Sequence, residues 1–178
     1  MPVNNLATAV KSLAATGAKN ILVINLPDLG KLPGTRTTER SNTLNDLTKK
    51  HNSGLAASLK QLRQQLAAIN IIYLDVNSLF NQVDNNPKKF GFTNVTNPCL
   101  SQDSICNKPN EYLFWDNIHP TTAAHKLLVE LAFSKLKPEP KPSSVSNHIL
   151  PVAIGAIVFA ALGAVAGLIL KRQNPSHG

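Results

Sequence analysis

The sequence predicts an α/β fold in which a small parallel sheet is flanked by helices. Two short apolar runs rich in β-branched residues, 20–26 and 70–76, indicate strands that are buried on both faces. A long amphipathic helical pattern over residues 41–69 separates them, and this order implies a right-handed crossover between parallel strands. With 178 residues, 43% of them hydrophobic, the chain is expected to form one globular domain with one appendage.

The first predicted element is an amphipathic helix over residues 1–17, in which four apolar side chains face one way: Val3, Leu6, Val10 and Leu13. This segment lacks the continuous apolar stretch of a signal peptide. The first strand, 20–26, is stopped by Pro27, and a loop that contains Gly30 and Gly34 comes next.

A second helix is predicted over residues 41–69, because leucine and isoleucine residues recur there at three-, four- and eight-residue steps. Ser41 is its expected N-cap. After the strand at 70–76, we expect a short helix over 78–83 and a long irregular loop over 85–113.

The apolar residues Leu113, Phe114 and Trp115 are expected to return the chain to the core before a last helix over 120–136. Pro120 suits the first turn of that helix. Only two strands are predicted, and a parallel sheet of that size leaves exposed edges and a thin core. Residues 1–136 therefore resemble half of a larger domain.

A linker is predicted over residues 137–148, where prolines alternate with small polar and charged residues. The next 22 residues, 149–170, contain no charged side chain. As a helix they would span roughly 33 Å, which matches the hydrocarbon core of a membrane at about 30 Å. The sequence thus predicts a single transmembrane helix at 149–170, followed by a short basic tail at 171–178.

Gly163 and Gly167 form a G-x-x-x-G pattern within the predicted transmembrane helix, which allows close contact with a second helix. The basic residues on the two sides of this segment are nearly balanced, so they do not decide its orientation.

The formal net charge is +8, and its distribution argues against nucleic-acid binding. Lysine and arginine residues occur singly or in pairs, without interleaved aromatic residues, as on a solvated basic surface. No cofactor or metal site is expected.

Cys99 and Cys106 lie in a segment rich in Asn, Ser, Asp and Pro. Their spacing suits a small disulfide that closes a loop, which would place the domain in an oxidising compartment. Their spacing is not that of a zinc site. Two free thiols in a cytosolic loop remain the alternative.

The sequence Asp116-Asn117-Ile118-His119 carries the strongest chemical signal, because it follows an aromatic cluster and precedes a helix. Because His119 lies three positions after Asp116, the Asp116 carboxylate can accept the Nδ1–H of His119 and leave Nε2 free as a general base. In an arbitrary chain such a pair is more often a capped turn with a surface histidine. Its place at the end of an apolar segment in an α/β chain favours a functional site.

Four segments together resemble the C-terminal half of the GDSL, or SGNH, family of esterases and lipases: GAKNILVINLPDLGKLPGT (17–35), NIIYLDVNSLF (70–80), FGFTNVTNPCL (90–100) and YLFWDNIHPTTAAHKLL (112–128). The bacterial secreted phospholipase, lysophospholipase and acyltransferase branch is the most similar. The resemblance implies a flavodoxin-like sheet for residues 1–136, with His119 as the base and Asp116 as its orienting acid. It makes Asp28 a residue of a structural turn.

The resemblance also implies a serine nucleophile in a Gly-Asp-Ser motif and oxyanion donors in a Gly-x-Asn-Asp motif, and neither motif occurs here. We therefore expect the C-terminal half of a Ser-His-Asp hydrolase of lipid or other acyl esters, inactive without its N-terminal half. The alternative is a non-catalytic membrane-tethered domain for binding or assembly. The domain is expected on the extracytoplasmic (periplasmic) side of a membrane, although a complete chain would be tail-anchored with its domain in the cytosol.

Overall fold

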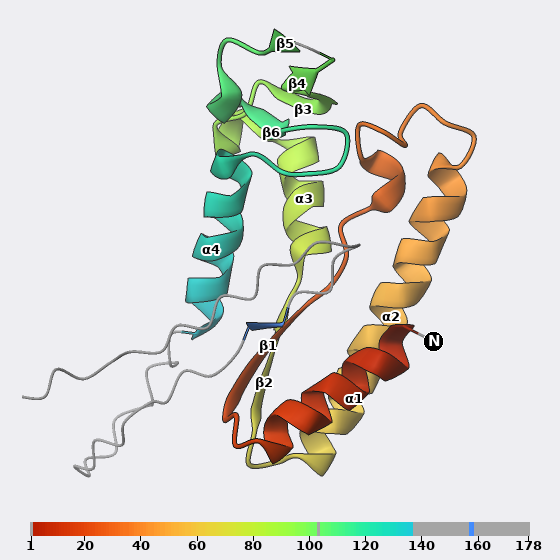
Figure 1. Cartoon of the computed structure of the whole chain (residues 1–178), viewed down its shortest axis with the longest axis vertical. Helices are drawn as coiled ribbons and strands as arrows, with labels where there is room; N and C mark the ends of the chain where they lie inside the picture. Colours follow the sequence, from red (N-terminus) through yellow and green to blue (C-terminus); the bar gives the residue numbers. More distant parts are fainter. Residues whose placement is uncertain (1, 103, 137–156, 159–178) are drawn as a thin grey trace, which may run out of the picture.

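Two parallel strands, β1 (Asn20–Ile24) and β2 (Asn70–Leu74), form the centre of the fold, as predicted. In the computed structural model, which describes residues 2–102, 104–136 and 157–158, they pair over their whole lengths (Figure 1). A third short strand, β7 (Ile157–Val158), pairs in parallel with the other edge of β1, which makes the order β2-β1-β7. The sheet is therefore small and entirely parallel.

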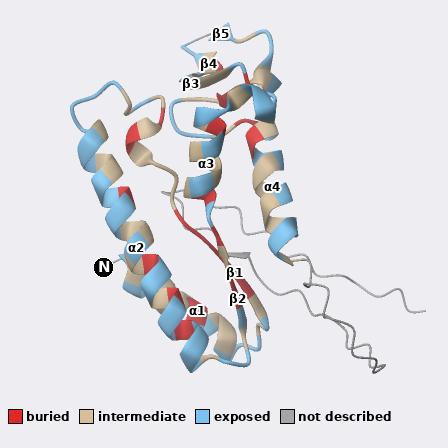
Figure 2. Ribbon diagram, turned by 180° about the vertical axis from the view of Figure 1, so that it is seen from behind, coloured by how far each residue is buried: buried red, intermediate tan, exposed pale blue. Residues whose placement is uncertain are grey.

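Helices pack against both faces of this sheet. Helices α1 (Pro2–Ala15) and α2 (Ser41–Gln65) cover one face, and α3 (Val76–Asn85) and α4 (Thr122–Leu136) cover the other (Figure 1). Because successive side chains of a strand point to opposite faces, β1 contributes to two separate cores. Figure 2 shows the buried residues concentrated on β1 and on the helix faces turned toward the sheet.

The core between the sheet and α1 and α2 contains seven buried residues: Val10, Ile21, Val23, Leu55, Leu59, Leu62 and Ile71. The core on the opposite face extends from the sheet to the segment that precedes α4, and includes Leu22, Leu74, Phe80, Phe92, Leu113 and Phe114. Each layer is completed by residues that lie far apart in the sequence.

The helices predicted at 1–17, 41–69 and 120–136 are confirmed, with ends that differ by a few residues. Ser41 is not the N-cap of α2. Arg40 occupies that position, and the Ser41 hydroxyl donates to the carbonyl oxygen of Gly30 at 2.8 Å. The predicted helix at 78–83 begins earlier, because the Asp75 carboxylate accepts from the backbone N–H of Ser78 and caps α3.

The prediction of an irregular loop over 85–113 is wrong in part. Strand β3 (Asn94–Pro98) pairs in parallel with β6 (Tyr112–Phe114), and the short strands β4 (Leu100–Ser101) and β5 (Ser104–Ile105) form a hairpin. Three short 3-10 turns occur at Leu29–Lys31, Pro87–Phe90 and Pro109–Glu111. These strands have no strong apolar alternation, so their pairing depends on contacts between separate segments.

A disulfide joins Cys99 to Cys106 around the β4–β5 hairpin, which confirms the first of the two alternatives for these residues. Within this loop, the backbone N–H of Cys106 also donates to the Cys99 carbonyl oxygen at 2.8 Å. The N–H of Cys99 donates to the Phe114 carbonyl oxygen at 3.0 Å, so the hairpin is attached to β6.

The predicted transmembrane segment, 149–170, lies outside the described residues except at Ile157–Val158. At these two residues the structure has a strand where a helix was expected, because the edge of β1 offers backbone groups for pairing. The linker at 137–148, the tail at 171–178, Gly163 and Gly167 also lie outside the described residues. None of the helices that the structure describes combines the length and hydropathy of a membrane span.

Removal of the disulfide is expected to destabilise the domain. Cys106→Ser should lower the free energy of unfolding by roughly 2 to 3 kcal/mol, because the bond closes a short loop in the unfolded chain. Urea unfolding followed by circular dichroism measures the change. A reductant should destabilise the wild-type protein by a similar amount and leave the Cys99→Ser, Cys106→Ser double variant unaffected. Equal stability of wild-type protein with and without reductant would contradict this expectation.

Candidate active site

Asp116 and His119 lie on a tight turn between β6 and α4. The turn is closed at its base, where the backbone N–H of Trp115 donates to the His119 carbonyl oxygen at 2.7 Å. Phe114 and Pro120 form an isolated antiparallel bridge at the same place. Since Leu113 and Phe114 are buried in the core, the turn projects from a fixed position.

The carboxylate of Asp116 binds three hydrogen-bond donors of its own turn. Its Oδ2 atom lies 2.7 Å from Nδ1 of His119. Its Oδ1 atom accepts from the backbone N–H groups of Ile118 at 2.8 Å and His119 at 2.7 Å. Such a turn is stabilised by the aspartate side chain itself, so the local sequence suffices to form it.

These contacts determine the protonation of Asp116. Partial burial by itself would raise the pKa of the carboxyl group. The backbone N–H groups of His119 and Ile118 and the His119 imidazole oppose it and hold the Asp116 pKa below its ordinary value. The group is therefore an ionised hydrogen-bond acceptor at neutral pH.

His119 is the more exposed member of the pair. Its side chain is 62% exposed, whereas that of Asp116 is 33% exposed. With Nδ1–H donated to the carboxylate, Nε2 carries the lone pair of the neutral ring. Among the residues that the structure describes, none forms a hydrogen bond with Nε2. The structure thus brings together the two residues that the sequence predicts as an acid and base, and no described serine contacts them.

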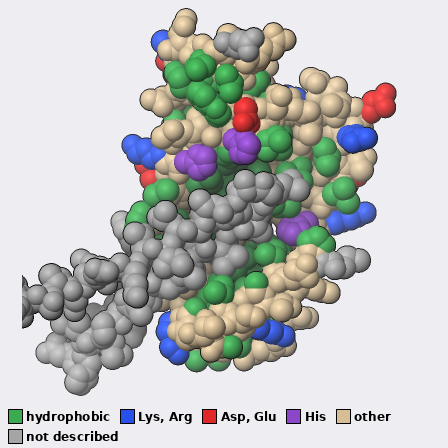
Figure 3. Space-filling view, in the orientation of Figure 1, with side chains coloured by type: hydrophobic (Ala, Val, Ile, Leu, Met, Phe, Trp, Pro, Cys, Tyr) green, Lys and Arg blue, Asp and Glu red, His purple; other side chains and the backbone are tan. Residues whose placement is uncertain are grey.

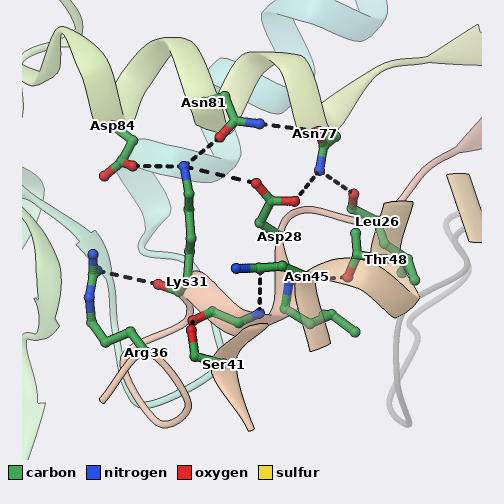
Figure 4. Close-up of polar contacts among 12 residues, drawn as sticks. Leu26, Asp28, Lys31, Arg36, Ser41, Asn45, Thr48, Asn77, Asn81 and Asp84 are labelled. Carbon is green, nitrogen blue, oxygen red and sulfur yellow. Dashed lines mark hydrogen bonds and ion pairs between the residues drawn. The ribbon is translucent and has the colours of Figure 1, made fainter. Parts of the chain in front are cut away.

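Asp28 lies in the turn that follows β1 and makes polar contacts within the fold. Its carboxylate accepts from the Asn77 side-chain amide at 3.0 Å and lies 3.9 Å from Lys31 Nζ (Figure 4). Asn77 also donates to the carbonyl oxygen of Leu26 at 3.1 Å. Asp28 therefore ties the end of β1 to the start of α3.

A polar cleft of about 640 Å³ lies beside α2 and the ends of β1 and β2, and neither Asp116 nor His119 lines it. Its wall includes buried Asn25, which donates to the Tyr73 hydroxyl and to Asp75, both at 2.8 Å, and accepts from the Asn77 N–H. Burial raises the pKa of the Tyr73 hydroxyl, the hydrogen bond from Asn25 opposes that rise, and Asp75 adds to it. At this wall of the cleft, the Asn25 amide, the Tyr73 hydroxyl and the Asp75 carboxylate are thus hydrogen-bonded within the fold.

The other described histidines have structural surroundings. His125 is exposed on α4, and its Nδ1 atom lies 2.9 Å from the Thr121 carbonyl oxygen. His51 is partly buried on α2, and its Nε2 atom lacks a hydrogen-bond partner within the described ranges. His148 and His177 lie outside those ranges.

Sequence reasoning missed the support that the turn receives from outside. The backbone N–H of Gly34 donates to the Asn117 carbonyl oxygen at 3.0 Å. Sequence reasoning also missed the hydrogen bond that the backbone N–H of Ile118 donates to the Asp116 carboxylate. A D-x-x-H turn with an aspartate in first position could have indicated the Ile118 contact, whereas the sequence contains no signal for the Gly34 contact.

The lowered pKa of Asp116 predicts that the turn keeps its hydrogen bonds down to low pH. The stability that Asp116 contributes is fully present above its ordinary pKa of 3.8 and is lost as the pH falls through the lower, folded value. In NMR titrations, the amide signals of Ile118 and His119 should shift with a midpoint below 3.8. Asp116→Asn should lack this transition. A midpoint at or above the ordinary value in the wild-type protein would contradict the assignment.

Comparison with known proteins places the chain in a family. Residues 1–132 match the family model for GDSL-like lipases and acylhydrolases. The GDSL esterase/lipase APG of Arabidopsis thaliana is 30% identical over 146 residues, which cover 71% of this chain and 41% of that protein. A GDSL lipase of Tanacetum cinerariifolium is 26% identical over 72% of this chain and 40% of its own length.

An anther-specific proline-rich protein APG of Arabidopsis thaliana is 33% identical over 68% of this chain and 26% of its own length. The chain thus spans between about a quarter and two fifths of the length of these relatives. They are plant proteins, so the expected similarity to a bacterial branch stays a prediction. The family model covers most of the chain. The α/β fold of the chain agrees with the fold class predicted from the sequence. This chain belongs to the GDSL lipase/acylhydrolase family.

Proposed function

We propose that this chain contributes the acid and base of a Ser-His-Asp hydrolase of carboxylic esters. The observation that supports this proposal most directly is the distance of 2.7 Å between the Asp116 carboxylate and Nδ1 of an exposed His119. The relatives named as esterases and lipases support the reaction class.

In the proposed reaction, Nε2 of His119 accepts the proton of a serine hydroxyl as the serine oxygen attacks the ester carbonyl carbon. The imidazolium formed in this step is stabilised by the ionised Asp116. His119 then returns the proton to the departing alcohol, and an acyl-enzyme remains. A water molecule then gives a proton to the same Nε2 atom as its oxygen attacks the acyl carbonyl carbon. The bond between the serine oxygen and the acyl group breaks, the carboxylic acid leaves, and His119 returns the proton to the serine oxygen.

The nucleophile and the oxyanion donors are proposed to come from a segment other than these 178 residues. The sequence contains neither the Gly-Asp-Ser nor the Gly-x-Asn-Asp motif of the family. The matched region covers about two fifths of the length of two of the relatives. The His119 side chain is 62% exposed, which leaves room for a serine from such a segment to reach it.

A lipid or another ester with an apolar acyl chain is the proposed substrate. Ile118, between the two reactive residues, is 55% exposed, and Ile105 on the β4–β5 hairpin is 59% exposed. Figure 3 shows hydrophobic side chains gathered on the same face as neighbouring acidic and histidine side chains. An exposed apolar side chain between the two proposed catalytic residues, such as that of Ile118, suits contact with an acyl chain.

An oxidising, extracytoplasmic compartment is the proposed location, because disulfides persist there and are rare in the cytosol. Anchoring through residues 149–170 and helix pairing through Gly163 and Gly167 are further proposals, and they rest on the hydropathy of the sequence alone.

Activity is expected only when the missing motifs are supplied. The chain is mixed with the N-terminal segment of the Tanacetum cinerariifolium GDSL lipase, and hydrolysis of p-nitrophenyl butyrate is followed. The rate of hydrolysis by the mixture should exceed the rate with either part alone. His119→Ala and Asp116→Asn should each reduce kcat by about a thousandfold or more, because the serine loses its oriented base.

His125→Ala is the matched control and should retain activity, since its Nδ1 atom lies 2.9 Å from the Thr121 carbonyl oxygen and has no described hydrogen bond with Asp116 or His119. Turnover that persists in His119→Ala would refute the proposed roles. A mixture without turnover, in which the two parts nevertheless associate, would favour the alternative of a binding or assembly domain.

The compartment can be tested by thiol labelling in intact cells that produce the chain. Cys99 and Cys106 should not react with a maleimide before reduction, and both should react after reduction and denaturation. Reaction of both thiols without reduction would contradict the proposed compartment.

A further inference from the structure

The turn that carries the reactive pair is held at its base and at its tip. Its base is closed by the hydrogen bond from Trp115 to His119. Its tip is Asn117, whose carbonyl oxygen accepts from the Gly34 N–H at 3.0 Å. The tip contact comes from the loop after β1, far from the turn in the sequence.

The contact at Gly34 leaves little room for a side chain. A Cβ atom built on Gly34 would lie 3.0 Å from Cβ of Asn117 and 3.2 Å from its carbonyl oxygen. Contacts this close require one of the partners to move by a few tenths of an ångström. Gly34 has no left-handed backbone conformation, so only the contact selects glycine here.

The loop that carries Gly34 is itself anchored to two helices. Lys31 Nζ donates to Asn81 of α3 at 2.8 Å and lies 3.1 Å from the Asp84 carboxylate (Figure 4). On the other side, the Gly30 N–H donates to the Asn45 side chain of α2 at 3.0 Å. A Cβ atom on Gly30 would collide with the Ser41 carbonyl oxygen, so the loop lies directly against α2.

The loop has further contacts that resist displacement. The Arg36 guanidinium donates to the carbonyl oxygens of Lys31 and of Val95 in β3, both at 3.3 Å. The Thr35 hydroxyl donates to the carbonyl oxygen of Leu29. Because the loop is held by α2, α3 and β3, a side chain at Gly34 would displace the less anchored partner, which is the exposed turn.

We propose that Gly34 is a positioning residue that sets the orientation of the Asp116–His119 turn through its contact with Asn117. This inference rests on the proposed function for its effect on catalysis, but the geometry of the turn can be measured without activity. The pair must be held within about half an ångström of its productive geometry for efficient proton transfer.

The test compares Gly34→Ala with Gly54→Ala in the full chain. Gly54 is the matched control: its backbone also suits alanine, and its added Cβ would lie 3.6 Å from Val3, an ordinary contact. In Gly34→Ala, the NMR amide signals of Ile118 and His119 should shift, and the titration midpoint of Asp116 should rise toward its ordinary value of 3.8. Gly54→Ala should leave both unchanged.

A second variant tests the inference if Gly34→Ala does not fold. Lys31→Met removes the contacts with Asn81 and Asp84, and should shift the same amide signals by a smaller amount. Lys60→Met, on the exposed face of α2, is its control. The inference would be overturned if the amide signals of Ile118 and His119 and the titration midpoint of Asp116 were all unchanged in Gly34→Ala. If Gly34→Ala does not fold, the same result in Lys31→Met would overturn it.

Activity measurements on the mixture with the N-terminal lipase segment distinguish this inference from the proposed function. Gly34→Ala should lower kcat by roughly three- to tenfold with little change in KM, because it misplaces the base without removing a substrate contact. Wild-type turnover that does not depend on His119 would refute the proposed function, and the NMR measurement would still decide the role of Gly34. Full His119-dependent activity in Gly34→Ala would refute the positioning role alone.

Discussion

The hydrogen bonds to the Asp116 carboxylate are the interaction on which the rest of the site depends. One oxygen accepts from two backbone N–H groups, and the other accepts from the His119 ring. The same group therefore shapes the turn, orients the imidazole and selects its tautomer. An ionised carboxylate can make all three contacts at once, and its lowered pKa follows from them.

The fold holds this turn from two sides. Leu113 and Phe114 fix its entry in the core, and α4 begins directly after it. The loop after β1 supports it from outside and is held in turn by polar contacts with α2 and α3. Polar contacts such as that of Lys31 thus connect the Asp116–His119 turn to the helices that flank the sheet. Such support limits how far the imidazole can move.

The two neighbours of β1 in the sheet pair with it over different lengths. Strand β2 pairs with β1 over its whole length, whereas β7 pairs with only Leu22 and Val23. Apolar side chains stay exposed on α4, at Val129 and Phe133, and between Asp116 and His119, at Ile118. The chain spans 41% and 40% of the length of two of its relatives.

The sequence by itself determined the types and order of the main helices and strands, the Cys99–Cys106 spacing and the Asp116–His119 pair. These features depend on periodicity or on residues a few positions apart, which local rules describe well. Only the tertiary structure decided the pairing of β3 with β6, the anchoring of Lys31 on α3 and the contact of Gly34 with Asn117. Each of these joins segments that are distant in the chain, and a single sequence carries no local signal for such contacts because packing alone brings them together.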